Sequence, residues 1–364
     1  METINRPSLI QDNLVFKGAK GNPLLAPRGV YLVGGQLFVA DTAQNRLFIW
    51  NELPKTEFQD PDVVLGQSDK QDTGRNANGG AGASSLFYPS GIWSDGTRLI
   101  VADAWNHRVL IWKTMPTRDG QPADVVVGQP DFEHNQPNVE GVGSDPTRQS
   151  LNWPYGVFSN GQELWIADTG NRRVLYYKSI PEENYAPADD LIGKSNFSER
   201  DYDHLNPIWP YSVKVSPTGA MTITDTQYYR VLLWKNGKTA FTQPADAIIG
   251  QASFEGNGQN QFAWFPSANS LNWCYDTCFY KNGLWVADTG NSRVLWFDHL
   301  PEGNNEAAQA VIGQDDFKTG SENKNTIWST ESSLYWPFQI CMDGAVMAIA
   351  DTGNHRVILN HLNF

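Results

Sequence analysis

The feature that most constrains this chain is a short segment that recurs six times along its 364 residues. The clearest copy reads LWIADTGNRRVLYY, from Leu164 to Tyr177. Each copy holds an Asp followed five residues later by an Arg: Asp41 and Arg46, Asp103 and Arg108, Asp168 and Arg173, Asp225 and Arg230, Asp288 and Arg293, Asp351 and Arg356. Successive Asp residues are 62, 65, 57, 63 and 63 positions apart, and this regular period predicts a repeat architecture.

Each copy predicts a β-hairpin. An apolar run such as LFVA or LWIA precedes the Asp, and a second run such as RVLIW begins at the Arg. Such β-branched and aromatic content on both sides of a turn is typical of two paired strands. We expect a structural role for the pair, in which the Asp caps backbone N–H groups and the Arg returns to it as a forked ion pair. We expect Gly170, Gly290 and Gly353 to supply a positive φ angle in the turn.

Two further landmarks divide each repeat into four strands. A Gly follows a short apolar run 25 residues after the Asp in five repeats: Gly66, Gly128, Gly193, Gly250 and Gly313. A Pro, replaced by Cys274 in the fifth repeat, stands 14 or 15 residues before the Asp: Pro27, Pro89, Pro154, Pro210 and Pro337. The predicted order is therefore Pro, strand A, a Gly turn, strand B, the Asp turn, strand C, and strand D ending at the Gly.

Six such units predict an all-β fold, a six-bladed β-propeller of four-stranded antiparallel blades. Only 13 residues follow Asp351, enough for strand C and too few for strand D. The segment 13–18, NLVFKG, precedes the first Pro as strand D precedes the others, so we expect it to complete the last blade and close the ring. We predict one domain over residues 1–364, with blades at about 27–66, 89–128, 154–193, 210–250, 274–313, and 337–364 plus 13–18.

The turn sequences DTGNRR, DTGNSRV and DTGNHRV resemble the NHL repeat, and the resemblance covers the whole chain. It implies a six-bladed propeller and says little about activity. Some NHL-like and related six-bladed propellers are metal-dependent lyases or lactonases, and some animal NHL proteins bind RNA. Two features depart from the family pattern: the period of about 60 residues is longer than that of a typical NHL repeat, and the fourth unit reads DTQYYR.

Charge and cysteine content restrict the partners and the compartment. The net charge of −13 disfavours binding to nucleic acid or to an anionic membrane. The three cysteines are too few for a disulfide framework, and the chain shows neither a secretory signal nor a long apolar run. We therefore expect a cytoplasmic protein without membrane contact, monomeric unless a partner binds.

The direction of the strands puts the Asp turns and the connections from strand D to the next strand A on one face, called here the loop face. Five of these connections are long, at 67–88, 129–153, 194–209, 251–273 and 314–336, whereas 19–26 is short. Long loops on a rigid scaffold commonly carry binding sites. Residues that break the repeat on this face, or aromatic residues that precede the Pro, are the predicted partner-binding set: Trp105, Tyr228 and Tyr229, and Trp153, Trp209, Trp273 and Trp336.

A second set of residues breaks the pattern of strand A and is predicted to line the central channel. This set comprises Lys214, Asp276, Gln339, Cys278 and Cys341. The six His residues lie in turns, in loops and near the ends of strand C, so a cluster of His ligands on the axis is not supported. No phosphate-binding loop, nucleophile elbow or paired CxxC motif is present, and we predict neither a catalytic residue nor a metal or cofactor.

These observations favour a non-enzymatic scaffold that binds a protein or peptide partner on the loop face. The alternative is a metal-assisted lyase or hydrolase that acts at the mouth of the channel. RNA binding is a third class, and the acidic charge of the chain argues against it.

Overall fold

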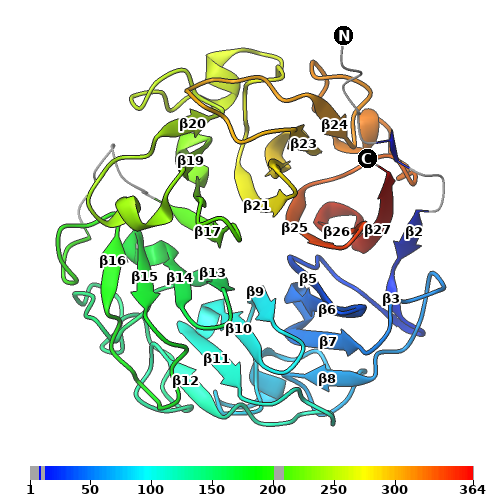
Figure 1. The fold of residues 1–364 in the computed structure, drawn as a ribbon. Helices are drawn as coiled ribbons and strands as arrows, with labels where there is room; N and C mark the ends of the chain where they lie inside the picture. Colours follow the sequence, from blue (N-terminus) through cyan, green and yellow to red (C-terminus); the bar gives the residue numbers. More distant parts are fainter. Residues whose placement is uncertain (1–7, 10–12, 201–208, 364) are drawn as a thin grey trace.

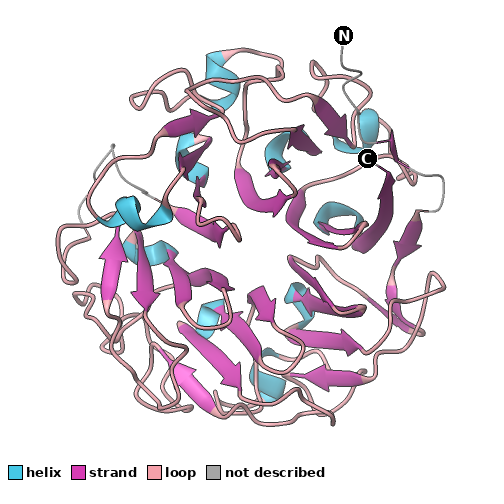
Figure 2. Ribbon diagram, in the orientation of Figure 1, coloured by secondary structure: helices cyan, strands magenta, loops and turns pink. Residues whose placement is uncertain are grey.

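A computed structural model of the chain describes residues 8–9, 13–200 and 209–363 and confirms the predicted fold class. Six antiparallel sheets surround a central axis as the blades of a propeller (Figure 1). Figure 2 shows that strands form the blades, while the connections are loops that contain short 3-10 turns. Within the described residues no helix is long and apolar enough to cross a membrane.

The first three blades each contain four strands that follow one another in the sheet. Blade 1 contains β5 (Gly29–Val33), β6 (Gln36–Asp41), β7 (Arg46–Trp50) and β8 (Val63–Leu65). Blade 2 contains β9 (Pro89–Ser94), β10 (Leu99–Asp103), β11 (Arg108–Trp112) and β12 (Val125–Val127). Blade 3 contains β13 (Pro154–Ser159), β14 (Leu164–Asp168), β15 (Arg173–Tyr177) and β16 (Asp190–Ile192).

The last three blades repeat this order. Blade 4 contains β17 (Pro210–Val215), β18 (Met221–Asp225), β19 (Arg230–Trp234) and β20 (Ala247–Ile249). Blade 5 contains β21 (Cys274–Tyr280), β22 (Gly283–Asp288), β23 (Arg293–Phe297) and β24 (Ala310–Ile312). Blade 6 contains β25 (Pro337–Asp343), β26 (Val346–Asp351) and β27 (Arg356–Asn363). The strands nearest the centre of Figure 1 are β5, β9, β13, β17, β21 and β25.

Short 3-10 turns occur at two kinds of place. Those between the second and third strands of the blades are η1 (Thr42–Gln44), η3 (Ala104–Asn106), η4 (Thr169–Asn171), η5 (Thr226–Tyr228), η8 (Thr289–Asn291) and η10 (Thr352–Asn354). Those in other connections are η2 (Arg75–Asn78), η6 (Gly237–Phe241), η7 (Gln259–Phe262) and η9 (Glu322–Lys324).

The N-terminal segment closes the ring, as the sequence predicts. Strand β2 (Leu14–Phe16) pairs antiparallel with β27, with Phe16 opposite Val357, and so takes the place of the missing fourth strand of blade 6. The short strand β1 (Ser8–Leu9) pairs with the end of β27. The chain then forms a small hairpin of β3 (Gly18–Ala19) and β4 (Asn22–Pro23) before it enters blade 1.

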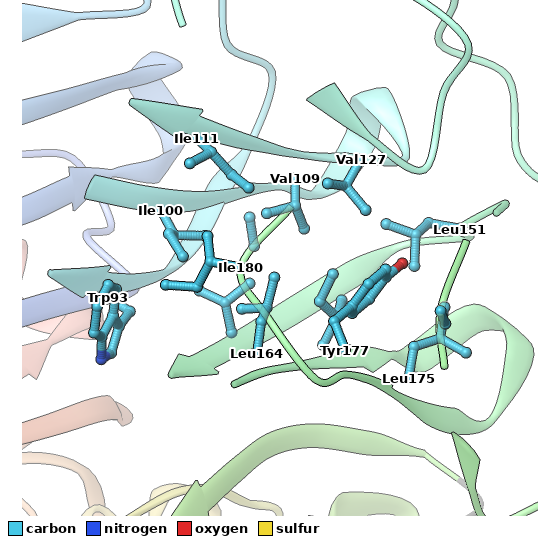
Figure 3. Close-up of a cluster of buried hydrophobic side chains, with 14 of the residues drawn as sticks. Trp93, Ile100, Val109, Ile111, Val127, Leu151, Leu164, Leu175, Tyr177 and Ile180 are labelled. Carbon is cyan, nitrogen blue, oxygen red and sulfur yellow. The ribbon is translucent and has the colours of Figure 1, made fainter. Parts of the chain in front are cut away.

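Apolar side chains between blades form the core of the protein. The central strands are apolar on both faces, because each sheet packs against a neighbour on each side. Figure 3 shows one such cluster, in which Ile100 and Val109 of blade 2 pack toward Leu164 and Tyr177 of blade 3. All five residues of β10 and of β11 are buried. The blades are therefore held together by side-chain packing between separate sheets.

The expected role of the turn glycines is wrong. The residue with a positive φ angle lies four positions after the Asp in every blade, for example Arg172 at 58°. Gly170, Gly290 and Gly353 are instead required by close approach, since a β-carbon on Gly170 would lie 2.5 Å from Asn152 Cγ. The preceding loop therefore packs directly on the turn where glycine is present.

Removal of the Phe16 side chain tests how firmly the N-terminal strand closes the ring. Phe16 is fully buried, and its ring lies 4.9 Å from that of Trp50, edge to face. Phe16→Ala is expected to lower the free energy of unfolding by about 3–5 kcal/mol, because it leaves a cavity between blades 6 and 1. Urea denaturation measures this change.

Lys17→Ala is the matched control, since the Lys17 side chain forms an exposed ion pair with Glu57 and the substitution keeps the backbone hydrogen bonds of this residue. Its loss is expected to be below about 1 kcal/mol. Equal unfolding midpoints for Phe16→Ala and Lys17→Ala would contradict closure by this strand.

Candidate functional site

The Asp–Arg pairs that recur in each repeat hold the long loops onto the blades. Arg173 Nε donates to Asp168 Oδ2 at 2.8 Å, and both side chains are fully buried. The remaining Arg173 nitrogens donate to carbonyls of both flanking loops, at Thr147, Ser150 and Phe197. The expected fork onto the carboxylate is therefore wrong for this blade, because the guanidinium uses its other N–H groups to bind the loops.

The carboxylate of each pair also binds a loop. Asp168 Oδ1 accepts a hydrogen bond from Asn152 N at 2.7 Å, and the Asp residues of the other five blades accept an equivalent bond. The Asp therefore caps a backbone N–H group of the loop that precedes its blade, and not one of the turn in which it lies. Burial raises the pKa of Asp168, and the Arg173 guanidinium opposes this shift. These bonds confirm that the Asp turns and the long loops share one face.

A second anchor fixes four of the long loops from the side. An Asn of the loop and the Asn of the turn exchange side-chain hydrogen bonds between their amides; for Asn260 and Asn291 these measure 3.1 and 2.8 Å. The other pairs are Asn76 with Asn106, Asn138 with Asn171, and Asn323 with Asn354. Each loop is therefore bound both at its Asn and at the carbonyls that accept from the Arg.

The loop tips between these anchors differ sharply in character. The tip of the loop between β20 and β21 reads QFAWFP, from Gln261 to Pro266, and that between β24 and β25 contains TIW, from Thr326 to Trp328. Trp264 is 96 % exposed and Trp328 75 % exposed, and Phe262, Phe265 and Ile327 are similarly open to solvent. The two loops touch, since a β-carbon on Gly320 would lie 3.1 Å from Pro266 Cγ. These five exposed side chains lie on two adjoining loops and are called here the aromatic tip surface.

Sequence reasoning missed the aromatic tip surface. The long loops were expected to carry a binding site, but no residue within their tips was singled out. The signal that could have identified Trp264 and Trp328 is the presence of consecutive large apolar residues inside otherwise polar loops. Such residues have no place in the repeat and no core to enter.

Three predicted partner-binding residues on the Asp turns lie in different environments. Trp105 is 41 % exposed; it stacks on Tyr88 at 4.5 Å between ring centroids, and its Nε1 donates to Tyr155 Oη at 3.2 Å. Tyr229 is half-buried. Tyr228 is buried, with its ring 4.9 Å from the Arg230 guanidinium, so its expected place on the surface is wrong. The ring and the guanidinium are close enough for a cation–π contact.

The aromatic residues that precede the Pro lie around the mouth of the channel. Trp153, Trp273 and Trp336 are each about two-fifths exposed and have φ angles of 49°, 47° and 53°. Trp209 is half-buried, and most of the loop before it, residues 201–208, lies outside the described residues. A left-handed backbone at a bulky residue is unusual and is held here by bonds to its N–H. Trp153 N, for example, donates to His107 Nδ1 at 3.1 Å.

The residues that follow the Pro, or Cys274, of each unit lie together at the channel mouth. They are called here the axial collar: Arg28, Ser90, Tyr155, Tyr211, Tyr275 and Phe338. Neighbouring aromatic rings of the collar lie in contact, with centroid distances of 4.7, 4.6 and 4.2 Å from Tyr155 to Phe338. The Arg28 guanidinium covers the Phe338 ring at 4.1 Å. A cavity of about 40 Å³ lies at the collar.

The residue that follows the collar residue differs between the two sides of the ring. A β-carbon on Gly29, Gly91 or Gly156 would lie within 2.7 Å of a carbonyl oxygen of the next blade, so glycine permits direct backbone contact there. In blades 5 and 6 the equivalent residues have side chains that accept hydrogen bonds from the backbone of the next blade. Asp276 Oδ2 accepts from Ile340 N at 3.2 Å, and Gln339 Oε1 accepts from Val30 N at 2.9 Å.

Lys214 and Asp276 form a buried ion pair in the channel. Lys214 Nζ lies 3.4 Å from Asp276 Oδ1, which also accepts from the Ser212 hydroxyl. Burial raises the pKa of Asp276, and Lys214 opposes this shift. The structure thus brings together two residues that the sequence predicted to line the channel, and Gln339 lines the same cavity.

Cys278 and Cys341 lie beyond Lys214, in a cavity of about 370 Å³ at the opposite end of the channel. Both thiols are free. Cys341 Sγ accepts from Leu32 N at 3.3 Å, and burial raises its pKa to about 11. Burial also raises the pKa of Cys278. Both groups are therefore thiols at neutral pH, and Cys341 has a structural use as a bridge to blade 1.

Among the described residues, no three or more His, Cys, Asp or Glu side chains come close enough together to hold one ion. The chemistry that the axial residues offer is hydrogen bonding, one buried ion pair and aromatic contact.

Solved structures share this architecture at low sequence identity. Hydrazine synthase of Kuenenia stuttgartiensis aligns over 94% of this chain and 96% of its own, with a TM-score of 0.51 and 10% identity. A structural genomics protein of unknown function from Bacteroides thetaiotaomicron aligns over 98% of this chain and 77% of its own, with a TM-score of 0.52 and 10% identity. Streptogramin B lyase aligns over 96% of this chain and 97% of its own, with a TM-score of 0.47 and 10% identity.

The similarity to the first two structures establishes the propeller fold alone, because their identity to this chain is so low. No family model and no curated protein sequence matches the chain.

The bond from Trp153 N to His107 predicts a pH dependence of stability. Burial lowers the pKa of His107 from 6.5 to about 4, so the unfolded chain binds the extra proton between these values. The contribution of His107 is complete above pH 6.5 and is lost as the pH falls toward 4. At most about 3 kcal/mol of unfolding free energy is expected to disappear.

His107→Asn is the matched variant, since Asn45 accepts from Tyr88 N at 3.1 Å at the same position in blade 1. This variant keeps an acceptor and removes the titration. Urea denaturation between pH 4 and 7 is expected to show a shallower pH dependence for His107→Asn than for the wild type. Parallel curves would contradict the assignment.

The buried ion pair predicts a coupling between Lys214 and Asp276. Asp276→Leu leaves the Lys214 charge unpaired and the Ile340 N–H without its acceptor, and is expected to cost about 3–5 kcal/mol of unfolding free energy. Adding Lys214→Met removes the unpaired charge and is expected to restore about 1–3 kcal/mol. Denaturation of the single and double variants measures the coupling, and simple addition of the two losses would show that the charges do not interact.

Proposed function

We propose that this propeller is a binding scaffold that captures a protein partner through its loop face. The observation that carries the proposal is the aromatic tip surface, in which Phe262, Trp264, Phe265, Ile327 and Trp328 are exposed on two adjoining loops. Single exposed apolar residues are common, but a group of large apolar side chains on neighbouring loops is typical of an interaction site.

The surroundings of these side chains support a protein as the partner. Trp is enriched among residues that dominate binding energy, because a large rigid ring buries much area at little entropic cost. The anchors at Asn260 and Asn323 hold the bases of both loops before any partner arrives. A preorganised loop loses less conformational entropy on binding.

Other features of the chain support proposals for its family, its compartment and the kind of partner it binds. The DTGN turns and their Asp–Arg pairs support membership of the NHL repeat class. The free thiols of Cys274, Cys278 and Cys341 support a reducing compartment such as the cytoplasm. The net charge of −13 supports a partner other than nucleic acid or an anionic membrane, and the chain is proposed to be a monomer when no partner is bound.

Replacement of the tip residues tests this function. A variant with Phe262→Ser, Trp264→Ser, Phe265→Ser and Trp328→Ser is expected to keep the wild-type melting temperature, because exposed residues contribute little to stability. Proteins captured from an extract of the native source are quantified by mass spectrometry, and the affinity of the captured protein is then measured by calorimetry. The variant is expected to bind at least about 30-fold more weakly, as for loss of a binding hot spot.

Val142→Ser is the matched control. Val142 is also fully exposed at a loop tip, but in the connection between blades 2 and 3. It is expected to bind as the wild type does. The proposal is wrong if the fourfold variant captures the same proteins in the same amounts as Val142→Ser.

A further inference from the structure

Arg28 is the exception in the axial collar. Blades 3 to 6 place Tyr or Phe at this position, and blade 2 places Ser90. The guanidinium lies 4.1 Å from the Phe338 ring centroid and 5.1 Å from that of Tyr88. Within residues 8–9, 13–200 and 209–363 it has neither an ion pair nor a side-chain hydrogen bond, so the aromatic rings fix its position while its N–H groups stay available.

A cavity of about 150 Å³ opens beside this guanidinium. It is lined by Arg28, Trp273, Tyr275, Thr289, Gly290, Trp336 and Phe338. The Thr289 hydroxyl already donates to Pro337 O. Arg28 therefore supplies the charge of the cavity, and aromatic rings supply most of the wall. An apolar cavity of about this volume holds a molecule as large as benzene.

The charge of Arg28 acts on the other collar residues. Burial raises the pKa of the Tyr155, Tyr211 and Tyr275 phenols, and the Arg28 charge opposes each of these shifts. The pair of Lys214 and Asp276 below it is neutral as a unit. An anion is repelled by the whole protein, which carries −13, but at this mouth it meets one uncompensated cation.

The geometry points to a binding site for a carboxylate that bears a compact aromatic or apolar group. The carboxylate accepts two parallel hydrogen bonds from the planar Arg28 fork, and the apolar group enters the cavity between Trp273 and Trp336. The acid is either a free small molecule or the C-terminal residue of a peptide, since both present the same chemistry. The site shares no residue with the aromatic tip surface and does not depend on the function proposed for it.

Benzoate is the probe that tests the site. The wild-type protein is titrated with benzoate in a calorimeter and followed by tryptophan fluorescence, because Trp273 and Trp336 line the cavity. Saturable binding is expected, and Arg28→Gln is expected to weaken it by at least about tenfold, as for loss of a bidentate charge-assisted contact. Arg28→Lys keeps the charge without the fork and is expected to give intermediate affinity. Benzamide, which is neutral, is expected not to compete.

Arg75→Gln is the matched control, because the Arg75 guanidinium also covers an aromatic ring, that of Phe87 at 4.3 Å, but Arg75 does not line either cavity at the mouth. It is expected to bind benzoate as the wild type does. A tripeptide ending in Phe, compared as free acid and as amide, distinguishes the two sources: binding of the free-acid peptide supports a chain terminus, and binding of benzoate alone supports a free acid.

Three results would overturn the site: no saturable binding of benzoate or of the peptide acid, equal affinity in the wild type and Arg28→Gln, or displacement of benzoate by inorganic phosphate at equal concentration. The melting temperature of each variant shows whether it is folded. If Arg28→Gln is unfolded, the comparison of Arg28→Lys with Arg75→Gln decides the question in the same titration.

Discussion

The buried Asp–Arg pair is the interaction on which the loop face depends. An isolated buried pair contributes little to stability, because desolvation of both charges offsets their attraction. Here the two side chains also satisfy backbone groups of the loops, as Asp168 accepts from Asn152 N and Arg173 donates to three carbonyls. Irregular backbone that packs over a blade would otherwise leave such groups unpaired. The pair is therefore the means by which an all-β scaffold carries long ordered loops.

This arrangement separates what the fold requires from what can vary. In the loop between blades 4 and 5, Asn260 and Ser267 are fixed by bonds to the next blade, and Gln261 is fixed by bonds to Gly250, Asn269 and Asn305. The apolar residues Phe262, Trp264 and Phe265 that follow are exposed. In the loop between blades 5 and 6, Asn323 and Thr330 are the equivalent fixed points. The tip between such points is therefore aromatic in one loop and Gly-rich in another, although the ring is the same. The scaffold thus tolerates exposed apolar side chains that its own core does not contain.

The fold was predictable from the sequence because the same pattern of Asp, Arg and apolar residues occurs six times. The Asp–Arg spacing, the apolar runs and the missing last strand were enough to place the blades and the closure by the segment containing Phe16. Details that depend on contacts between repeats were not predictable. Gly170 was expected to supply a positive φ angle to the turn, but glycine is needed there because Asn152 packs directly against it. Tyr228 was expected on the surface, because nothing in the local sequence pattern shows that its ring lies against the Arg230 guanidinium.

The residues on the channel axis show the same limit of prediction from sequence. Lys214 and Asp276 were singled out because they break strand A, yet their pairing depends on the angle between blades 4 and 5. Arg28 carried no signal, since a single Arg next to a Pro is unremarkable until Phe338 and Tyr88 are brought around it from residues far away in the sequence. A ring closed on one side by glycine contacts and on the other by side-chain bridges is not symmetric. The cavity beside Arg28 lies on the side of the ring where Gln339 bridges blade 6 to blade 1, and aromatic residues of blades 5 and 6 line it.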